Sequence, residues 1–448
     1  MFTLRYLILS LVVLIPSSSF FWSTYLVGQQ KLGLLTAHEI KIAQQLRYTP
    51  VLLHELEQHE KYSLAWFEQA SVLAPYHGEV AVELAHFYQQ KKQGKQALRW
   101  LEKAVELEQP KGVNLLAKYY AETEQYLQAK QLLAQFLNHP QVLTLAIELA
   151  VEHGDSEAII KLAPLLAAQP SLTTLYQQLL TFNIITVAEN ANKPLWSPSV
   201  MTPTCPHSIQ FYATRLSDLQ HITRLIEGFR AHALAEYFCF APVAYIPKPV
   251  LACYHQGAEA IQCHEQNWPS WVTNTKSQYL GIMLPEGGAN VHRKIVYLDS
   301  DDDIDVFRHE LSHLLGFVDE YALRKGHLFC QAGSSESSLN VVVKERLYYG
   351  DRTKLRQQII NDLPWGEWID DKTPIFTKQQ VRQGNIDQQK AWLLGTPISH
   401  NKAVGVFPAR TCSNNNVAAF KPTSKLTLLE YDDMPLPKLY LKLLNHHL

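Results

Sequence analysis

Two histidines four residues apart, His309 and His313, enclose a glutamate, Glu310. On a helix, this spacing places both imidazoles on one face and one turn apart, so that they can bind the same cation. Glu310 leaves the helix at a different angle but close by, where it can take a proton from a water molecule held at that cation. These three residues predict a zinc hydrolase in which Glu310 is the general base.

The residues after the second histidine supply a third ligand. Gly316 follows His313 by three residues and Asp319 follows Gly316 by three. Glycine accepts the positive φ that ends a helix and turns the chain back, which would bring Asp319 to the metal ion. Three protein ligands with one open position are what a catalytic zinc needs. The neighbouring Glu320 competes with Asp319 for this role.

The extended motif resembles the metzincin metallopeptidases, and the ending Asp319-Glu320-Tyr321 resembles the IgA-peptidase-like family. Segments of residues 363–369, 373–375 and 404–407 also resemble that family, so the likeness spans about residues 205–440. It implies a metzincin-like α+β zinc peptidase domain with a methionine turn beneath one zinc ion. The candidate for that turn is Met434, and the candidates for support of the oxyanion are Tyr431 and Tyr440.

Two other interpretations of the histidine pair stay open. His309 and His313 are also compatible with the polar face of an ordinary amphipathic helix whose buried face is formed by Leu311, Leu314 and Leu315. A degenerate peptidase fold without metal would retain the same residues. In that case the chain would be a non-catalytic scaffold or assembly factor.

The segment before the motif predicts a strand that leads into the helix. Residues 294–299 are β-branched or aromatic in the middle, which favours an edge-like strand. Residues 300–305 contain four carboxylates, which suit the positive end of a helix dipole. A calcium site is the alternative, although the glycine and the distal glutamate of an EF-hand loop are missing.

The N-terminal segment predicts export. No charged residue lies between Arg5 and Lys31, and the stretch from Tyr6 to Gly28 would be about 34 Å long as a helix, enough to span a bilayer. We expect an uncleaved signal anchor at residues 1–30, with the bulk of the chain periplasmic. The alternative is a signal peptide with a break at Pro16 and small residues Ser17 to Ser19 before the cut, which would give a secreted protein.

Cysteine content agrees with export. All six cysteines lie between residues 205 and 412, after the helical array, and an even number in an exported domain indicates disulfides. Six cysteines allow fifteen sets of pairs, so the sequence leaves the connectivity open. Cys253 with Cys263 is the simplest local pair, and Cys330 with Cys412 is a candidate that would join the segments after the motif. A net charge of −2 without a basic stripe argues against a nucleic-acid partner.

Residues 35–180 predict a helical array. Phe67 and Ala70 recur as Leu101 and Ala104, a shift of 34 residues, and the pattern continues at Leu133. This resembles the tetratricopeptide repeat, in which stacked helical hairpins bury the apolar surface that a single hairpin would leave exposed. A fourth, irregular unit is expected near residues 158–170. Such arrays bind peptides or proteins, so we expect recruitment of a substrate or partner, with a structural spacer or a plain amphipathic bundle as alternatives.

A proline-rich junction at residues 181–206 separates the array from the catalytic half, residues 207–448. We expect a strand at residues 208–213, a helix at 219–235, and strands at 243–246 and 281–284. Together with the strand before the motif, these predict an α+β domain. The predicted function is a membrane-anchored zinc endopeptidase that cleaves protein or peptide substrates.

Overall fold

The structure is a computed structural model that describes residues 22–31, 35–185, 207–254, 260–273, 275–331, 338–379, 391–415 and 417–447. The chain divides into two compact units, Met1–Gln178 and Leu179–Leu448. The predicted junction at residues 181–206 begins close to this division, and its residues 186–206 lie outside the described part.

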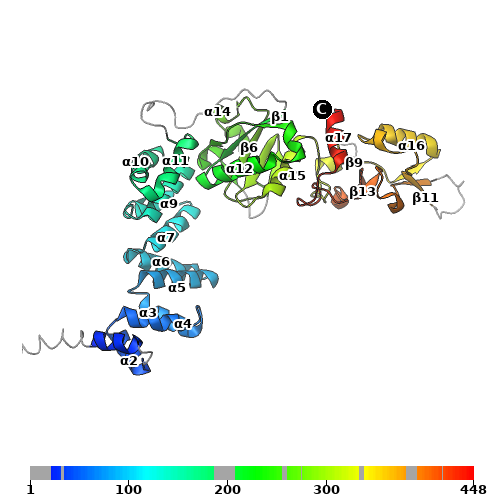
Figure 1. Ribbon diagram of the computed structural model, residues 1–448. Coiled ribbons are helices and arrows are strands. Elements are labelled where there is room, and N and C mark those ends of the chain that lie inside the picture. Colours follow the sequence, from blue (N-terminus) through cyan, green and yellow to red (C-terminus); the bar gives the residue numbers. More distant parts are fainter. Residues whose placement is uncertain are drawn as a thin grey trace, which may run out of the picture. The chain divides into compact units, whose positions relative to one another are not determined.

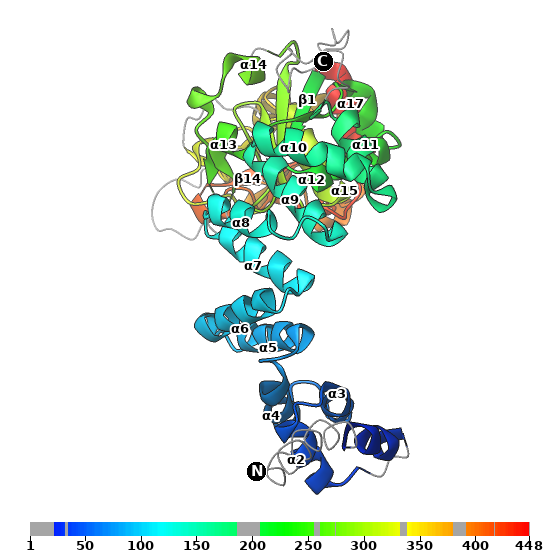
Figure 2. The ribbon, with the colours of Figure 1, turned by 90° about the vertical axis from the view of Figure 1, so that its left-hand side faces the viewer.

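The first unit is an array of α-helices, as predicted (Figure 1). Successive helices pack against each other, and α5–α6, α7–α8 and α9–α10 each form a hairpin (Figure 2). Proline at the first position starts α7 and α9, and Gly154 with φ of +67° ends α9. The helices are α2 (Ala37–Gln45), α3 (Thr49–Glu57), α4 (Leu64–Leu73), α5 (Gly78–Gln90), α6 (Gly94–Glu106), α7 (Pro110–Glu122), α8 (Tyr126–Leu133), α9 (Pro140–His153), α10 (Ser156–Ala167) and α11 (Thr173–Thr181).

Small residues allow the helices of the array to approach closely. Ala70 and Ala104 are fully buried, and a Cβ atom added to Gly112 would lie 2.5 Å from that of Ala104. The repeat length is less regular than the predicted 34 residues, because α5, α7 and α9 begin at intervals of 32 and 30 residues. Leu165, assigned to the fourth unit, is 42% exposed, so its side chain does not continue the buried pattern.

A mixed sheet forms the first half of the second unit, as the α+β prediction requires. Its strand order is β2-β1-β6-β8-β7, and β3 also pairs with β1. All pairings are parallel except that of the edge strand β7 with β8. The strands are β1 (His207–Ala213), β2 (Phe238–Phe240), β3 (Ala244–Tyr245), β6 (Tyr279–Leu284), β7 (Asn290–His292) and β8 (Ile295–Asp299).

Aromatic and aliphatic side chains cover both faces of this sheet. On one face lie α12 (Leu216–Phe229) and α15 (Ile304–Leu314), where the Phe307 ring packs 5.6 Å from that of Phe211 and 5.5 Å from that of Phe229. On the other face, Tyr212 and Tyr297 share a buried cluster with residues of α13 (Lys248–Leu251) and α14 (Ser270–Thr273). This packing fixes α15, which carries the candidate site.

Two details of the prediction are wrong. The strand before the motif is β8, which lies inside the sheet between β6 and β7 and has buried side chains at four of its five positions, so it is not an edge strand. The helix predicted to extend to residue 235 ends at Phe229, and a 3₁₀ helix follows at Ala233–Tyr237. Apolar spacing continues across both segments, which is why periodicity alone joined them.

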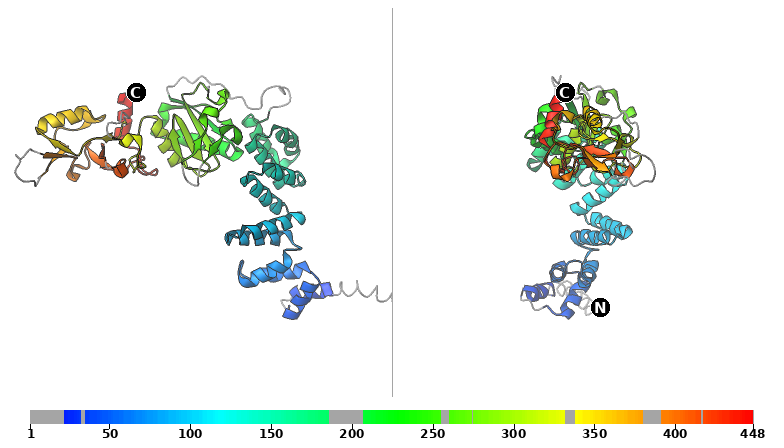
Figure 3. Two further views of the ribbon diagram at one scale, coloured as in Figure 1. Left: turned by 180° about the vertical axis from the view of Figure 1, so that it is seen from behind. Right: turned by 90° about the vertical axis from the view of Figure 1, so that its right-hand side faces the viewer.

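The chain after the sheet forms two small antiparallel sheets, drawn from yellow to orange in Figure 3. The indole of Trp365 donates a hydrogen bond of 2.8 Å to the carbonyl of Gly405, which joins two of the segments quoted for the family resemblance. The elements are β9 (Val342–Val343), β10 (Leu347–Tyr349), α16 (Arg352–Asn361), β11 (Phe376–Gln379), β12 (Ala391–Leu394), β13 (Phe407–Ala409), β14 (Ala419–Lys421) and α17 (Lys438–His447).

The structure contains both of the candidate pairs, although the sequence left the connectivity open. Cys253 and Cys263 face each other across the hairpin of β4 (Cys253–Tyr254) and β5 (Gln262–Cys263). Cys330 and Cys412 join segments 82 residues apart in the sequence. Cys239 is disulfide-bonded too, and Cys205 lies outside the described residues.

The predicted membrane segment, Tyr6 to Gly28, lies mostly outside the described residues, which begin at Trp22. Within the described ranges, no helix combines the length and the apolar character needed to cross a bilayer.

Candidate functional site

The helix α15 presents His309, Glu310 and His313 from a defined start. Asp303 caps its N-terminus, because the Asp303 carboxylate accepts hydrogen bonds from the backbone N–H groups of Asp305 and Val306. The capping role predicted for the acidic run is therefore confirmed at Asp303.

The two histidines and Asp319 converge. The Nε2 atoms of His309 and His313 lie 3.0 and 3.2 Å from Asp319 Oδ1. The Nδ1 atom of each ring faces a backbone carbonyl, that of Leu428 at 2.8 Å for His309 and that of Phe317 at 3.1 Å for His313. A ring that donates from Nδ1 and is otherwise neutral keeps the lone pair on Nε2 for a metal ion. With these acceptors at Nδ1, each ring turns Nε2 toward Asp319, and Nε2 is the nitrogen that would bind a metal ion after losing its proton.

Gly316 turns the chain so that Asp319 can reach the histidines. Its φ is +91°, the left-handed region that the sequence predicted, and it lies directly after the end of α15. Asn340 then holds the returning chain, because its side chain accepts from the Val318 N–H at 2.9 Å and donates to the Val318 carbonyl at 2.9 Å. Asp319 is therefore placed by its neighbours on both sides.

Glu320 does not compete for the metal position. Its side chain is fully buried, and Oε2 lies 2.7 Å from Lys421 Nζ and accepts from the Thr427 hydroxyl at 2.9 Å. Oε1 accepts from Asn340 at 3.1 Å and from the Tyr440 hydroxyl. Burial raises the pKa of Tyr440 well above its ordinary value, and the Glu320 carboxylate raises it further, so Tyr440 stays neutral and donates. Both oxygens of Glu320 are occupied by this network.

Carboxylates next to the imidazoles stabilise positive charge there. Burial alone would lower the pKa of His309, but hydrogen bonds to Asp319 and Asp432 outweigh burial and raise it to about 11. The pKa of His313 is also raised, because Asp319 outweighs the effect of burial. Burial would raise the pKa of Asp319, yet the two imidazoles lower it well below its usual range. A divalent cation would satisfy the same carboxylate.

Glu310 stands apart from the other carboxylates of the site. It is 6% exposed, and its Oε2 has no hydrogen-bond partner within the described residues. Its ligand atom lies within 4.8 Å of those of His309 and His313, but only Asp319 touches both Nε2 atoms. Burial raises the pKa of Glu310. A carboxylate whose pKa is raised toward neutral is suited to accept and return a proton.

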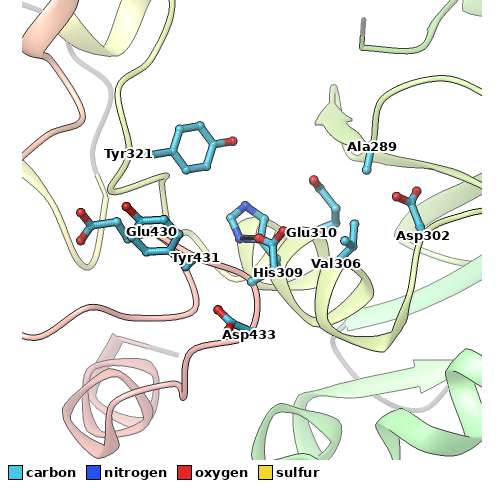
Figure 4. A pocket seen from close by; sticks show the side chains of 10 residues that line it. Ala289, Asp302, Val306, His309, Glu310, Tyr321, Glu430, Tyr431 and Asp433 are labelled. Atoms are coloured by element: carbon cyan, nitrogen blue, oxygen red, sulfur yellow. Dashed lines mark ion pairs between the residues drawn. The ribbon is translucent and has the colours of Figure 1, made fainter. Parts of the chain in front are cut away.

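A cavity of about 630 Å³ opens over His309 and Glu310 (Figure 4). Figure 4 shows Tyr321 and Tyr431 on one side of Glu310 and Asp302 on the other. The ring of Tyr321 is stacked 6.1 Å from that of His309. The cavity is lined by Ala289, Asp302, Val306, His309, Glu310, Tyr321, Glu430, Tyr431, Asp432 and Asp433.

The remaining predicted residues fall in different places. Tyr431 lines the cavity, whereas Tyr440 is buried against Glu320 and does not. Met434 is half-buried, and its N–H donates to the Tyr431 carbonyl at 3.0 Å, which closes a turn directly after the lining residues. Its side chain is not among the residues that line the cavity.

Two residues beside the histidines, Tyr321 and Asp432, were not predicted from the sequence. Tyr321 is part of the motif and follows the predicted ligand Asp319 by two residues, and this closeness was a signal in the sequence. Asp432 lies 3.0 Å from His309 Nδ1 and stands in the sequence two residues before Met434. Its contact depends on a chain return over more than a hundred residues, for which the sequence holds no local signal.

Comparison with known proteins adds no assignment. No family model matches the chain, and no curated protein matches it.

Proposed function

We propose that this protein is a zinc-dependent endopeptidase of the metzincin type. The observation that carries the proposal is the convergence of His309, His313 and Asp319 beside the unpartnered carboxylate of Glu310. The cavity that His309 and Glu310 line is proposed to admit the substrate. Burying a carboxylate oxygen without a hydrogen-bond partner costs free energy. A non-catalytic scaffold would gain nothing from this cost, whereas a general base requires a free oxygen.

The donor atoms fit a zinc ion. Ligand atoms bound tetrahedrally at zinc's usual distances are about 3.3 Å apart. The two Nε2 atoms lie 3.0 and 3.2 Å from Asp319 Oδ1, so small movements bring all three onto one ion. Two imidazoles and one carboxylate leave the fourth position open, as in catalytic zinc sites.

A bound zinc ion would acidify a water molecule and polarise the carbonyl of the scissile bond. The protein supplies the proton transfers. Glu310 takes the proton from the attacking water and returns it to the leaving nitrogen, for which its raised pKa is suitable. Tyr321 and Tyr431 line the cavity and can donate hydrogen bonds to the carbonyl oxygen as negative charge develops there.

The helical array is proposed to recruit protein substrates or a partner, as tetratricopeptide-like arrays do. Disulfides in the catalytic unit favour an oxidising compartment, which agrees with an extracytoplasmic, membrane-anchored enzyme.

Metal analysis and one substitution test the function. The oxidised full-length chain, loaded with zinc, should bind one ion and cleave members of a mixed peptide library. Glu310→Gln should keep the zinc and lose roughly 10²- to 10⁴-fold in kcat. Glu227→Gln, on the exposed face of α12, is the matched control. A chain that binds no zinc, or a Glu310→Gln variant with full activity, would favour the scaffold function.

A further inference from the structure

The cavity over the site is strongly acidic. Five of its lining residues carry carboxylates, and no lysine or arginine is among the lining residues. Such a cavity attracts positive charge and disfavours acidic peptides.

Three of these carboxylates already have a role. Glu310 is the proposed base, Asp432 lies 3.0 Å from His309, and Glu430 lies 2.8 Å from the buried Lys421. The carboxylates of the other two, Asp302 and Asp433, form no ion pair within the described residues; the His221 ring lies 2.7 Å from the backbone carbonyl of Asp302, not from its carboxylate. They are the negative charges of the cavity that the protein does not neutralise.

Asp302 is the better placed of the two. It is half-buried, whereas Asp433 is exposed at the rim. One oxygen of Asp302 accepts a hydrogen bond of 2.6 Å from the Asp299 N–H, and no other hydrogen bond reaches its carboxylate within the described residues. Burial raises the pKa of Asp302 to about 7, and nearby carboxylates, including Glu310, raise it further. A cation beside Asp302 would relieve this cost.

The position of Asp302 points to a substrate side chain. Figure 4 shows it on the far side of Glu310 from Tyr321 and Tyr431, next to Ala289 and Val306. Ala289 and Val306 give this part of the cavity small apolar walls, against which the methylene groups of a lysine or arginine can pack. The unpartnered oxygen of Glu310 in the same cavity marks the place of the scissile bond.

We propose that the enzyme prefers peptides with lysine or arginine close to the scissile bond, and that the cationic side chain lies against the Asp302 carboxylate. The exposed Asp433 adds attraction at the rim. This inference rests on the proposed function for the bond that is cleaved, but the binding preference can be measured without cleavage.

Paired peptides test it. Alanine-based decapeptides carry one arginine, or one citrulline of the same shape without charge, at each position in turn. With the zinc-loaded full-length chain, we expect kcat/KM for arginine to exceed that for citrulline about tenfold or more at one position near the cleaved bond. Asp302→Asn should reduce this ratio to near one, while Asp301→Asn, which removes an exposed neighbouring charge outside the cavity, should preserve it.

A binding measurement separates the two proposals. Fluorescence anisotropy with the same peptides and the Glu310→Gln chain needs no turnover. If no peptide is cleaved but arginine binds more tightly than citrulline through Asp302, the peptidase proposal falls and the charge preference stands. If peptides are cleaved and arginine and citrulline behave alike, or Asp302→Asn leaves the ratio unchanged, the charge preference is overturned.

Discussion

Glu320 should be one of the most sensitive positions for stability in the second unit, residues 179–448. It is fully buried, it pairs with Lys421 at 2.7 Å, and it accepts hydrogen bonds from Thr427, Asn340 and Tyr440. In Glu320→Ala, these donors lose their acceptor in a dry environment. Removing one partner of a buried ion pair costs about 3–5 kcal/mol.

We expect Glu320→Ala to lower the free energy of unfolding by about 4 kcal/mol, because Glu430 at 2.8 Å still compensates part of the Lys421 charge. For a unit of this size, such a loss lowers Tm by roughly 10 °C. Calorimetry on the oxidised full-length chain measures the shift. Hydrogen exchange read by mass spectrometry assigns it to the peptides that contain residues 309–320 and 427–444.

Glu227→Ala is the control, because this glutamate is exposed and its loss should change stability by less than about 0.5 kcal/mol. In the double variant Glu320→Gln/Lys421→Met, both charges are gone, so it should be less damaged than the two single losses added together. A Glu320→Ala variant as stable as the control would refute the view that this network holds the site.

Three further predictions follow from the geometry. Zinc should displace protons from His309 and His313, because Asp319 raises the pKa values of both rings. The apparent zinc affinity, measured by chelator competition, should therefore increase by up to about two log units for each pH unit. An affinity independent of pH would contradict this. Replacing Cys330 and Cys412 by alanine should lower the free energy of unfolding by up to about 4.5 kcal/mol, and replacing Cys253 and Cys263 by about 2.7 kcal/mol. The difference arises because the first disulfide closes a loop of 82 residues and the second a loop of 10. Equal losses in thermal unfolding would argue against this account by loop entropy. Gly281→Ala should destabilise the sheet strongly, because the added Cβ would lie 2.0 Å from the Phe211 ring. Gly94→Ala should be tolerated, because no atom lies within 4 Å of the added Cβ. Soluble yield and Tm compare the two variants.

The local part of the site was predictable from the sequence. The spacing of His309 and His313 fixes their relation through helix geometry alone, and Gly316 marks a positive φ that only the next few residues determine. The strand before α15 and the capping by Asp303 follow from composition within the same short segment. Each of these inferences depends on neighbours within about one helical turn.

The contacts that complete the site were not predictable in this way. Asp319 and Glu320 are adjacent, and what separates their roles is the arrival of Lys421, about a hundred residues later, at Glu320. The same holds for Tyr440, which was expected near the oxyanion and instead donates to Glu320. Only the tertiary packing decides which of several similar side chains reaches the cavity.

The loop of residues 427–433 couples the metal position to the folding of the C-terminal segment. Leu428 accepts from His309, the neighbouring Leu429 accepts from the Glu320 N–H at 2.7 Å, and Thr427 donates to the Glu320 carboxylate. The orientation of His309 therefore requires that this loop be in place. Since a metal ion binds only the folded arrangement, zinc should in turn stabilise the loop by mass action. The helix α15 supplies the two histidines, but the distant C-terminal loop holds His309 in the orientation that the proposed metal binding would require.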